Sequence, residues 1–344
     1  MPTFFIVLMQ SFLVRRIFFV RDGGIDSELR SQSSGVSQGC TLSPLLFITV
    51  MSVLMHDAVR MLSPSARAAY DAGGLADVGY ADDTLLLGIK QEFLNEFLEV
   101  VTFAGQRFGL ALHSGKLQLL NVRCQCSLTT ADGLRVHGKP ILDYLGTTLD
   151  ASGEVIGELN RRIGMAKADM RSLCRVWRRC SLSASRRLDI YRALVESKLL
   201  FSLAGICLNA SATRRLNGFQ AKCLRTVLRI PAAFYSRISN AEVLRRAKQT
   251  LASEKLMSQQ LQLFGKSGRS SNESPLRRWC CVGDSLRPLV NHYVRRVGRP
   301  KREWAPTVLQ EAIRRVGDYD AMCMLVQDEK SWNCEVVCKR LCVL

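Results

Sequence analysis

Apolar residues recur at helical spacing in two long stretches of the first 110 residues. Residues 45–62 (LLFITVMSVLMHDAVRML) are apolar nearly all round, which predicts a buried helix. Ser43 and Pro44 precede this stretch, and a hydroxyl cap followed by proline is typical of a helix start. Residues 91–108 place six apolar side chains on one face and acids on the other, which predicts an amphipathic helix that ends at Gly109.

Shorter patterns around these helices predict strands. The turn RDGG, residues 21–24, is expected to join two short strands, because its two glycines can take positive φ. Residues 75–89 (LADVGYADDTLLLGI) alternate too weakly for a surface strand and predict two short buried strands that meet at adjacent aspartates. Residues 116–122 and 144–149 predict two more strands. The N-terminal run FFIVLMQSFLV predicts a helix rather than a signal sequence, because no basic residue precedes it.

From residue 157 onward the pattern becomes helical and rich in arginine. The change from a mixed pattern to this helical one near the segment DASGE predicts a domain boundary. Residues 1–151 are then expected to form a mixed α and β part, and residues 152–265 a helical part. Beyond Gly265 the segment KSGRSSNESPLRRW has few apolar residues. We therefore expect residues 266–344 to form a basic linker and a C-terminal helical tail.

The composition indicates a folded intracellular protein. With 344 residues, 47% of them apolar, the chain can bury a sizeable core. The apolar run from Leu42 to Met55 is interrupted by serine, threonine and proline, so no membrane span is expected. Thirteen cysteines at irregular spacing, without a secretory signal, favour reduced thiols in the cytoplasm or nucleus over secretion.

The net charge of +18 is concentrated in the second half of the chain. Residues 1–150 hold 12 basic and 14 acidic residues, whereas residues 151–344 hold 36 basic and 16 acidic ones. This asymmetry favours a polyanion bound along the second half, either nucleic acid or an acidic membrane surface, over a solvated basic face. Basic residues at intervals of three to six along one predicted helix should contact a nucleic-acid backbone. They are Arg161, Lys167, Arg171, Arg175 and Arg178.

The adjacent carboxylates of Asp82 and Asp83 carry the strongest chemical signal. They repel each other, and neighbouring apolar strand residues magnify that repulsion. Mg²⁺ or Mn²⁺ would relieve it, because hard cations bind carboxylate oxygens together with substrate phosphates. Such sites drive phosphoryl transfer in polymerases and nucleases. An ordinary Asp-Asp turn at a hairpin tip is the alternative.

Four motifs in order resemble the reverse transcriptases of non-LTR (LINE-type) retrotransposons. QGCTLSPLLF and YADD resemble the palm of that family, and GLALHSGK resembles the segment after its catalytic hairpin. YLG resembles its primer grip, and the Arg-rich helices resemble its thumb. The resemblance covers residues from about 10 to 300. It implies an α+β fold, with an incomplete right-hand polymerase palm followed by an all-helical thumb.

The resemblance also implies an activity and a set of site residues. The activity is RNA-directed DNA polymerisation by two-metal nucleotidyl transfer, with Mg²⁺ or Mn²⁺ as cofactor and an RNA template and DNA primer as partners. Asp82 and Asp83 would bind metal, and Lys116 would contact the departing pyrophosphate. The residues implied for template, nucleotide or primer are Gln38, Gly39, Ser43, Pro44 and Tyr80, with Tyr144, Leu145 and Gly146 as the primer grip.

The chain departs from the family pattern at two points. Ser37 stands where the family has a basic residue, which removes one phosphate contact. The family also needs a third aspartate on a strand upstream, whereas only 37 residues precede Gln38, and Asp22 and Asp26 lie in a predicted turn. We therefore expect the C-terminal two thirds of a reverse transcriptase, truncated or decayed. A catalytically inactive nucleic-acid-binding remnant and a group II intron-type reverse transcriptase are the alternatives, and the oligomeric state stays open.

Two features near the C-terminus are weighed separately. GRPK, residues 298–301, could enter a minor groove, but a flexible basic linker is the favoured interpretation. Cys334, Cys338 and Cys342 share one helix face, with Cys323 upstream. Because metal ligands usually lie two to four residues apart and no histidine follows, buried free thiols are expected there.

Overall fold

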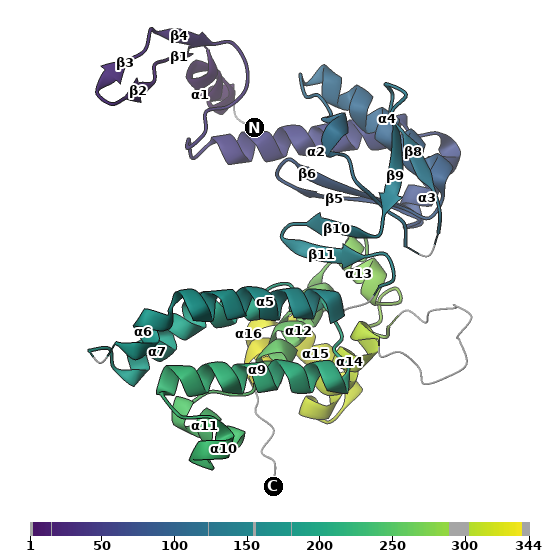
Figure 1. The fold of residues 1–344 in the computed structure, drawn as a ribbon. Coiled ribbons are helices and arrows are strands. Elements are labelled where there is room, and N and C mark those ends of the chain that lie inside the picture. The colour runs from purple at the N-terminus through teal and green to yellow at the C-terminus, as the bar shows by residue number, and fades with distance from the viewer. Residues whose placement is uncertain are drawn as a thin grey trace. The chain divides into compact units, whose positions relative to one another are not determined.

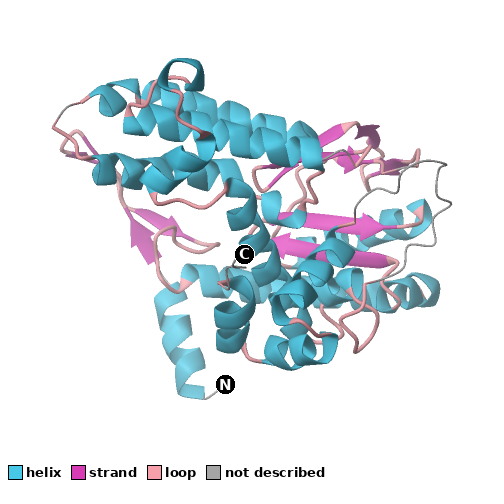
Figure 2. Cartoon of the chain, turned by 90° about the horizontal axis from the view of Figure 1, so that it is seen from below, coloured by secondary structure: helices cyan, strands magenta, loops and turns pink. Residues whose placement is uncertain are grey.

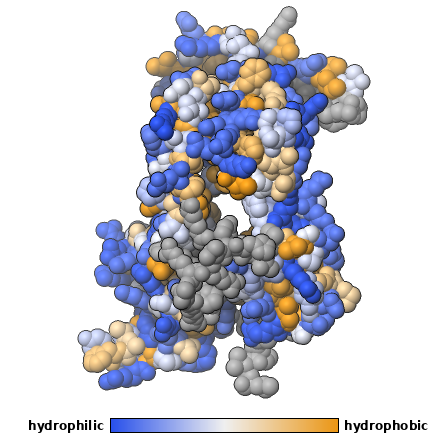
Figure 3. Space-filling model, turned by 90° about the vertical axis from the view of Figure 1, so that its right-hand side faces the viewer, coloured by the Kyte–Doolittle hydropathy of each residue, from blue (hydrophilic) through white to orange (hydrophobic). Residues whose placement is uncertain are grey.

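The computed structural model describes residues 3–14, 16–122, 124–153, 156–179, 181–288 and 303–338. They belong to two compact units, the first made of Met1–Leu117 and Ser127–His137 and the second of Gln118–Cys126 and Gly138–Leu344 (Figure 1). Helices dominate, and the strands form small sheets of two or three members (Figure 2). The mixed α and β class is therefore as expected. On the face drawn in Figure 3, hydrophilic residues predominate and apolar ones are scattered among them.

The N-terminal part of the first unit consists of a helix and two strand pairs. Helix α1 spans Thr3–Leu13, as predicted. Strands β1 (Arg16–Phe18) and β4 (Arg30–Gln32) pair antiparallel and flank the hairpin of β2 (Arg21–Asp22) and β3 (Ile25–Asp26). The hairpin loop has positive φ at both glycines, 56° and 84°, which confirms the predicted turn.

The core of the first unit forms where α2 (Ser43–Met61) packs on α4 (Gln91–Arg107). Both helices begin and end close to the predicted positions, and Gly109 follows α4 with φ 69°. Helix α3 (Pro64–Asp71) and the hairpin of β5 (Leu75–Tyr80) and β6 (Asp83–Gly88) complete this core. The 3₁₀ turn η1 (Ser114–Lys116) and strand β8 (Ser127–Thr129), which pairs with the start of β9 (Arg135–Lys139), lie at its edge.

Two predictions about burial in the first unit are wrong. The apolar residues that α2 contributes to the core lie from Met51 onward. In its N-terminal half Leu45 and Ile48 are 62% and 57% exposed. Strands β5 and β6 are half-buried, since one face of this two-stranded sheet packs on α4.

The expectation that no apolar run is long enough for a membrane also needs correction. Among the described helices, α2 is long and apolar enough to cross a membrane, with 17% of its 18-residue window buried. The hydroxyls of Thr49 and Ser52 donate to the carbonyls of Leu45 and Ile48, so these polar side chains are satisfied within the helix. A core helix of a soluble protein meets the same criterion.

The second unit begins with short strands and continues as helices. Strand β7 (Leu119–Leu120) pairs parallel with the end of β9, and β10 (Ile141–Tyr144) pairs with β11 (Thr147–Asp150). Residues 144–149 were expected as one strand, but the turn at residues 145 and 146 makes them part of a hairpin. The helical elements that follow are α5 (Ile156–Ser172), α6 (Cys174–Arg178), α7 (Ala184–Ile190), η2 (Tyr191–Glu196), α8 (Ser197–Leu200), η3 (Leu203–Gly205), α9 (Ala210–Leu228), α10 (Ala233–Ser236), α11 (Asn240–Ala247), α12 (Ala252–Arg269), α13 (Pro275–Cys280), α14 (Trp304–Val316), α15 (Tyr319–Gln327), α16 (Glu329–Ser331) and η4 (Trp332–Val337).

Helix α12 belongs to two hydrophobic clusters of the second unit. Its N-terminal Ala252 and Leu256 pack in the cluster built mainly on α5, η2, α8 and α9. Its C-terminal Leu261 and Phe264 pack with the helices from α13 onward. The indole of Trp332 lies so close to Gly265 that a Cβ there would be 2.3 Å from Nε1, so only glycine fits at this position.

The expected domain boundaries therefore differ from the structure. A boundary at residue 265 would fall inside α12, which continues to Arg269, and residues 275–280 form α13 instead of a linker. Gly265, Ser267 and Gly268 of α12 are buried. The β10–β11 hairpin, which was expected in the first part, belongs to the second unit.

The C-terminal cysteines are not the buried thiols that were predicted. Cys334 and Cys338 are exposed and Cys323 is half-buried, because Trp332, Val336 and Val337 occupy the buried face instead. Cys342 and the GRPK segment lie outside the described residues.

Candidate functional site

The adjacent aspartates lie at the tip of the β5–β6 hairpin. Tyr80 pairs with Asp83, so the loop has two residues, Ala81 and Asp82. Ala81 has φ 53°, a left-handed conformation that usually requires glycine. The tip thus holds a strained backbone, and such strain persists only where the flanking strands enforce it.

The side chains of this tip face solvent. Tyr80 is 65% exposed, and Asp82 and Asp83 are both exposed. No ion pair within the described part of the chain includes either carboxylate. The described residues also contain no cluster of three or more His, Cys, Asp or Glu side chains suited to a metal. The tip therefore presents two hard oxygen donors that are open to a cation from solvent.

The loop before α2 is held by Arg16. Its Nη1 donates to Ser37 Oγ at 2.9 Å and its Nη2 to the Gly35 carbonyl at 2.6 Å. Gln38 and Gly39 follow at the exposed crest of this loop, where Gly39 has φ 86°. The guanidinium of Arg16 therefore lies beside Ser37, the position where the resembled family has a basic residue. Here the basic group comes from β1 instead of from the loop.

Ser43 and Pro44 begin α2 as predicted, but the serine does not cap it. Ser43 Oγ donates to the Ser37 carbonyl at 2.7 Å and so ties the loop to the helix. The exposed Cys40 lies between them, and hydrogen bonds from the backbone N–H groups of Leu42 and Ser43 lower the pKa of its thiol.

Lys116 lies at the end of the η1 turn and is exposed. A strand was expected from this residue to 122, but only Leu119 and Leu120 pair, because β9 offers a parallel partner for just two positions. The structure therefore keeps Lys116 available as a phosphate contact without bringing it into an ion pair among the described residues.

The predicted primer-grip residues form the tip of the β10–β11 hairpin. Tyr144 ends β10, and Leu145 and Gly146 form the loop with φ 48° and 71°, the signs that a type I′ turn requires. The Gly146 carbonyl accepts hydrogen bonds from Arg161 and Arg162 of α5. This hairpin is thus fastened to the first long helix of the second unit.

A buried ion pair strengthens that attachment. Glu158 and Arg162 are each 3% exposed, and Arg162 Nε donates to Glu158 Oε1 at 2.5 Å. Glu158 Oε2 accepts from the backbone N–H of Thr148 at 3.1 Å, and Oε1 accepts from Ser202 Oγ at 3.0 Å. The guanidinium of Arg162 lies 4.6 Å from the centre of the Phe201 ring. Each partner is therefore satisfied inside the protein.

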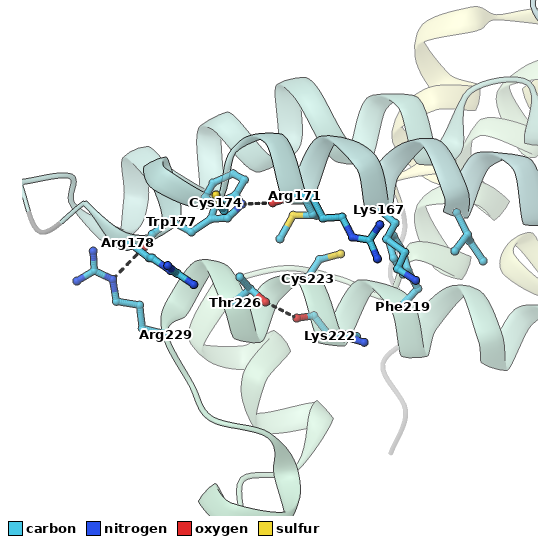
Figure 4. Close-up of a pocket in the computed structure, with 12 residues that line it drawn as sticks. Lys167, Arg171, Cys174, Trp177, Arg178, Phe219, Lys222, Cys223, Thr226 and Arg229 are labelled. Carbon is cyan, nitrogen blue, oxygen red and sulfur yellow. Dashed lines mark hydrogen bonds between the residues drawn. The ribbon is translucent and has the colours of Figure 1, made fainter.

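A groove of about 730 Å³ lies between α5, α6 and α9. Helices α5 and α9 lie side by side (Figure 1). Lys167 and Arg171 extend from α5 toward α9 (Figure 4). The groove has an apolar floor and a basic rim, and its lining contains no carboxylate. The floor is Ile163, Met170, Trp177, Phe219 and Cys223, and the rim is Lys167, Arg171, Arg178, Lys222 and Arg229.

The groove brings together three of the five residues of the predicted basic stripe, Lys167, Arg171 and Arg178. Arg161 turns away to Gly146 and Glu158, and Arg175 is exposed outside the groove. Arg161, within α5, is drawn to its hydrogen-bond partners, whereas Arg175 follows a break at Leu173, where α5 ends and α6 begins, so that helical spacing does not continue.

Three rim cations remain open to an anion. Within the described part of these helices the ion pairs are made by other residues, such as Lys198 with Asp169. Lys167, Arg171 and Lys222 are exposed without such a pair. The α9 wall, with Phe219, Lys222 and Arg229, was not anticipated from the sequence. Its signal is the spacing of residues 219, 222, 223 and 226, which places them on one helix face.

The comparisons with known proteins bear on the first 149 residues. A family model described as reverse transcriptase (RNA-dependent DNA polymerase) matches residues 2–149. This segment is similar to the reverse transcriptase domains that the family model describes. No curated protein matches the chain.

The reverse transcriptase match includes both the loop before α2 and the Asp82–Asp83 hairpin. It therefore supports RNA-directed DNA polymerase chemistry in general and, with it, nucleic acid as the partner. The match ends at residue 149, before the helices that carry the groove.

Proposed function

We propose that this chain acts in RNA-directed DNA synthesis of the non-LTR retrotransposon kind, in the nucleus or cytoplasm. The observation that carries the proposal is the Asp82–Asp83 pair at an exposed hairpin tip within the segment that matches reverse transcriptases. The loop of Gln38 and Gly39 would lie along the template or nucleotide, where glycine permits close approach of the backbone.

The residues at the hairpin tip fit a divalent cation by their chemistry. Asp82 and Asp83 are solvent-facing carboxylates, the donors that Mg²⁺ and Mn²⁺ prefer. Bound there, Mg²⁺ would neutralise charge that develops on the transferred phosphoryl group. Tyr80 would lie beside the primer end, and the Lys116 ammonium would stabilise the departing pyrophosphate.

The second unit would hold the nucleic acid. Phosphates would lie against Lys167, Arg171 and Lys222, because these exposed cations form no ion pair among the residues that the structure describes. The β10–β11 tip, held by Arg161 and Arg162, would act as the primer grip on a thumb formed by the Arg-rich helices. Contacts of this kind fix position without reading sequence.

A second candidate function is nucleic-acid binding without catalysis. It is favoured by one observation: the described residues offer two carboxylates at the hairpin and no cluster of three potential ligands. Two-metal transfer in the resembled family uses a further aspartate. Under this alternative the groove would act alone.

The metal site has a direct test. We expect the chain to bind Mn²⁺ weakly, with a dissociation constant on the order of 1 mM, because two carboxylates give few ligands. Asp82→Ala should abolish this binding in a titration followed by electron paramagnetic resonance. Asp22→Ala is the matched control, since Asp22 is also an exposed carboxylate next to a two-residue hairpin loop. Equal Mn²⁺ uptake by wild type and Asp82→Ala would contradict the assignment.

Primer extension separates the two candidate functions. On poly(rA) with an oligo(dT) primer and Mg²⁺, we expect the chain to bind the hybrid and add no nucleotide by itself. The reason is the missing third ligand among the described residues. If the wild type extends the primer and Asp83→Ala does not, two carboxylates suffice for catalysis and this chain is a polymerase without a further subunit.

A further inference from the structure

Two neighbouring aromatic rings on α10 project into solvent. Phe234 is 73% exposed and Tyr235 is 79% exposed. Their rings meet edge to face, with centroids 5.4 Å apart and an interplanar angle of 84°. Neither belongs to a hydrophobic cluster of the second unit. Two exposed rings side by side do not contribute the stability that their burial would give. Exposed aromatic pairs of this kind are typical of surfaces that bind a ligand.

The segment that carries these rings is firmly held. Arg225 of α9, 8% exposed, donates from Nη1 to the Pro231 carbonyl at 3.2 Å and from Nη2 to the Ile238 carbonyl at 2.6 Å. It also donates to Ser236 Oγ and to Asn240 Oδ1 at 3.0 Å. One buried guanidinium thus joins both ends of the segment, so the exposed rings are presented by an ordered support.

A cation lies beside the rings, in a segment with an excess of basic residues. The guanidinium of Arg237 lies 5.4 Å from the centre of the Phe234 ring. From Arg225 to Lys248 the only acidic residue is Glu242, against six basic ones. Hydrogen bonds from Arg245 and Arg246 lower the pKa of Glu242 to about 2, so this carboxylate is already engaged.

We propose that Phe234 and Tyr235, called here the aromatic platform, bind unpaired bases of single-stranded nucleic acid by stacking. Every base has a π face, and exposed aromatic rings beside cations form the usual platform for single strands. The positive charge suits a polyanion, and an ordered pair of rings suits flat ligands. The aromatic platform lies on α10, whereas the groove is formed by α5, α6 and α9, so it is a separate site that requires no polymerase chemistry.

The experiment uses the full chain and fluorescence anisotropy of a labelled 20-nucleotide oligo(dT), with a hairpin duplex as the second ligand. In the double variant Phe234→Leu and Tyr235→Leu, the apolar area is largely kept and the rings are lost. We expect its affinity for the single strand to fall by about tenfold or more, since each stack is worth roughly 5-fold to 100-fold. Tyr235→Phe should bind like the wild type. Phe103→Leu, which removes a ring that is 58% exposed on α4, is the matched control.

The outcomes separate the aromatic platform from other occupants and from the groove. Loss of single-strand binding with unchanged duplex binding supports stacking. If the double Leu variant binds oligo(dT) as tightly as the wild type, the proposal is wrong. A lipid surface is the other possible occupant. If neither the wild type nor the double Leu variant binds oligo(dT), and both bind vesicles of phosphatidylserine and phosphatidylcholine equally well, the proposal is also wrong and the patch is an apolar lipid contact. A defect of the groove lowers duplex binding as well, so the two sites are distinguishable.

Discussion

Replacing Arg162 by alanine is expected to lower the free energy of unfolding of the second unit by about 3–5 kcal/mol. The substitution leaves the Glu158 carboxylate buried without its nearer charged partner. It also removes a donor from the Gly146 carbonyl and the ring contact with Phe201. A carboxylate at 3% exposure is poorly solvated, and the cation that remains beside it, Arg161 Nη1 at 3.5 Å, is a more distant partner than Arg162. Urea unfolding followed by circular dichroism measures the loss.

The controls for Arg162 separate burial of charge from loss of a side chain. Arg175→Ala removes an exposed arginine near the same helix and should change the stability by about 0.5 kcal/mol or less. Replacing both Glu158 and Arg162 by methionine should cost less than Arg162→Ala, because no unpaired charge is left. A double variant that is as unstable as Arg162→Ala would show that the hydrogen bonds to the hairpin, and not the buried charge, dominate.

The triple variant Lys167→Ala, Arg171→Ala and Lys222→Ala is expected to lose affinity for a primer–template hybrid on the order of 100-fold at 0.1 M salt. Each cation that contacts phosphate releases counterions when it binds, so each loss should flatten log K against log salt by roughly 0.7 to 0.9. The total change in slope should therefore be about 2 to 3. Fluorescence anisotropy between 50 and 300 mM salt measures both quantities.

Arg175→Ala is the matched control for the groove, because this arginine is also exposed but lies outside it.

Alkylation of cysteines gives a second measurement of where the hybrid binds. Cys174 is exposed in the groove, so bound hybrid should slow its reaction with iodoacetamide while exposed Cys124 reacts at the same rate. Burial raises the pKa of Cys223 to about 12, so this groove thiol should stay unreactive throughout. If Arg175→Ala weakens binding as much as the triple variant, the groove is not the interface.

The local elements could be predicted well from sequence because their signals are local. The RDGG hairpin and the helix 91–107 follow from glycine conformations and from apolar periodicity, which act within a few residues. Burial was less predictable. The sequence of α2 is apolar nearly all round, so its own pattern does not show that Leu45 and Ile48 stay exposed while Leu54 and Ala58 are buried.

The candidate site shows the same division. Asp82 and Asp83 at a hairpin tip were predicted, because adjacent carboxylates between apolar strands are a local signal. The role of Ser43 as a link to Ser37, and the approach of Arg16 to that loop, depend on contacts across 6 and 21 residues. The α9 wall of the groove was missed for the same reason: helical spacing shows which residues share a face but not which helix lies opposite.

Helix α12 has a consequence for how this chain can be rearranged by recombination. Because one continuous helix supplies Leu256 to one cluster and Phe264 to the next, the two clusters share a wall and neither is complete without it. Exchange of the last 80 residues with those of a relative would have to preserve a glycine that accommodates the Trp332 indole, or it would disturb both clusters at once. Crossover points are therefore more tolerable in the loops before Ala252 than at the segment where α12 passes between the clusters. The C-terminal helices of this protein should be inherited together with the helices that form the groove.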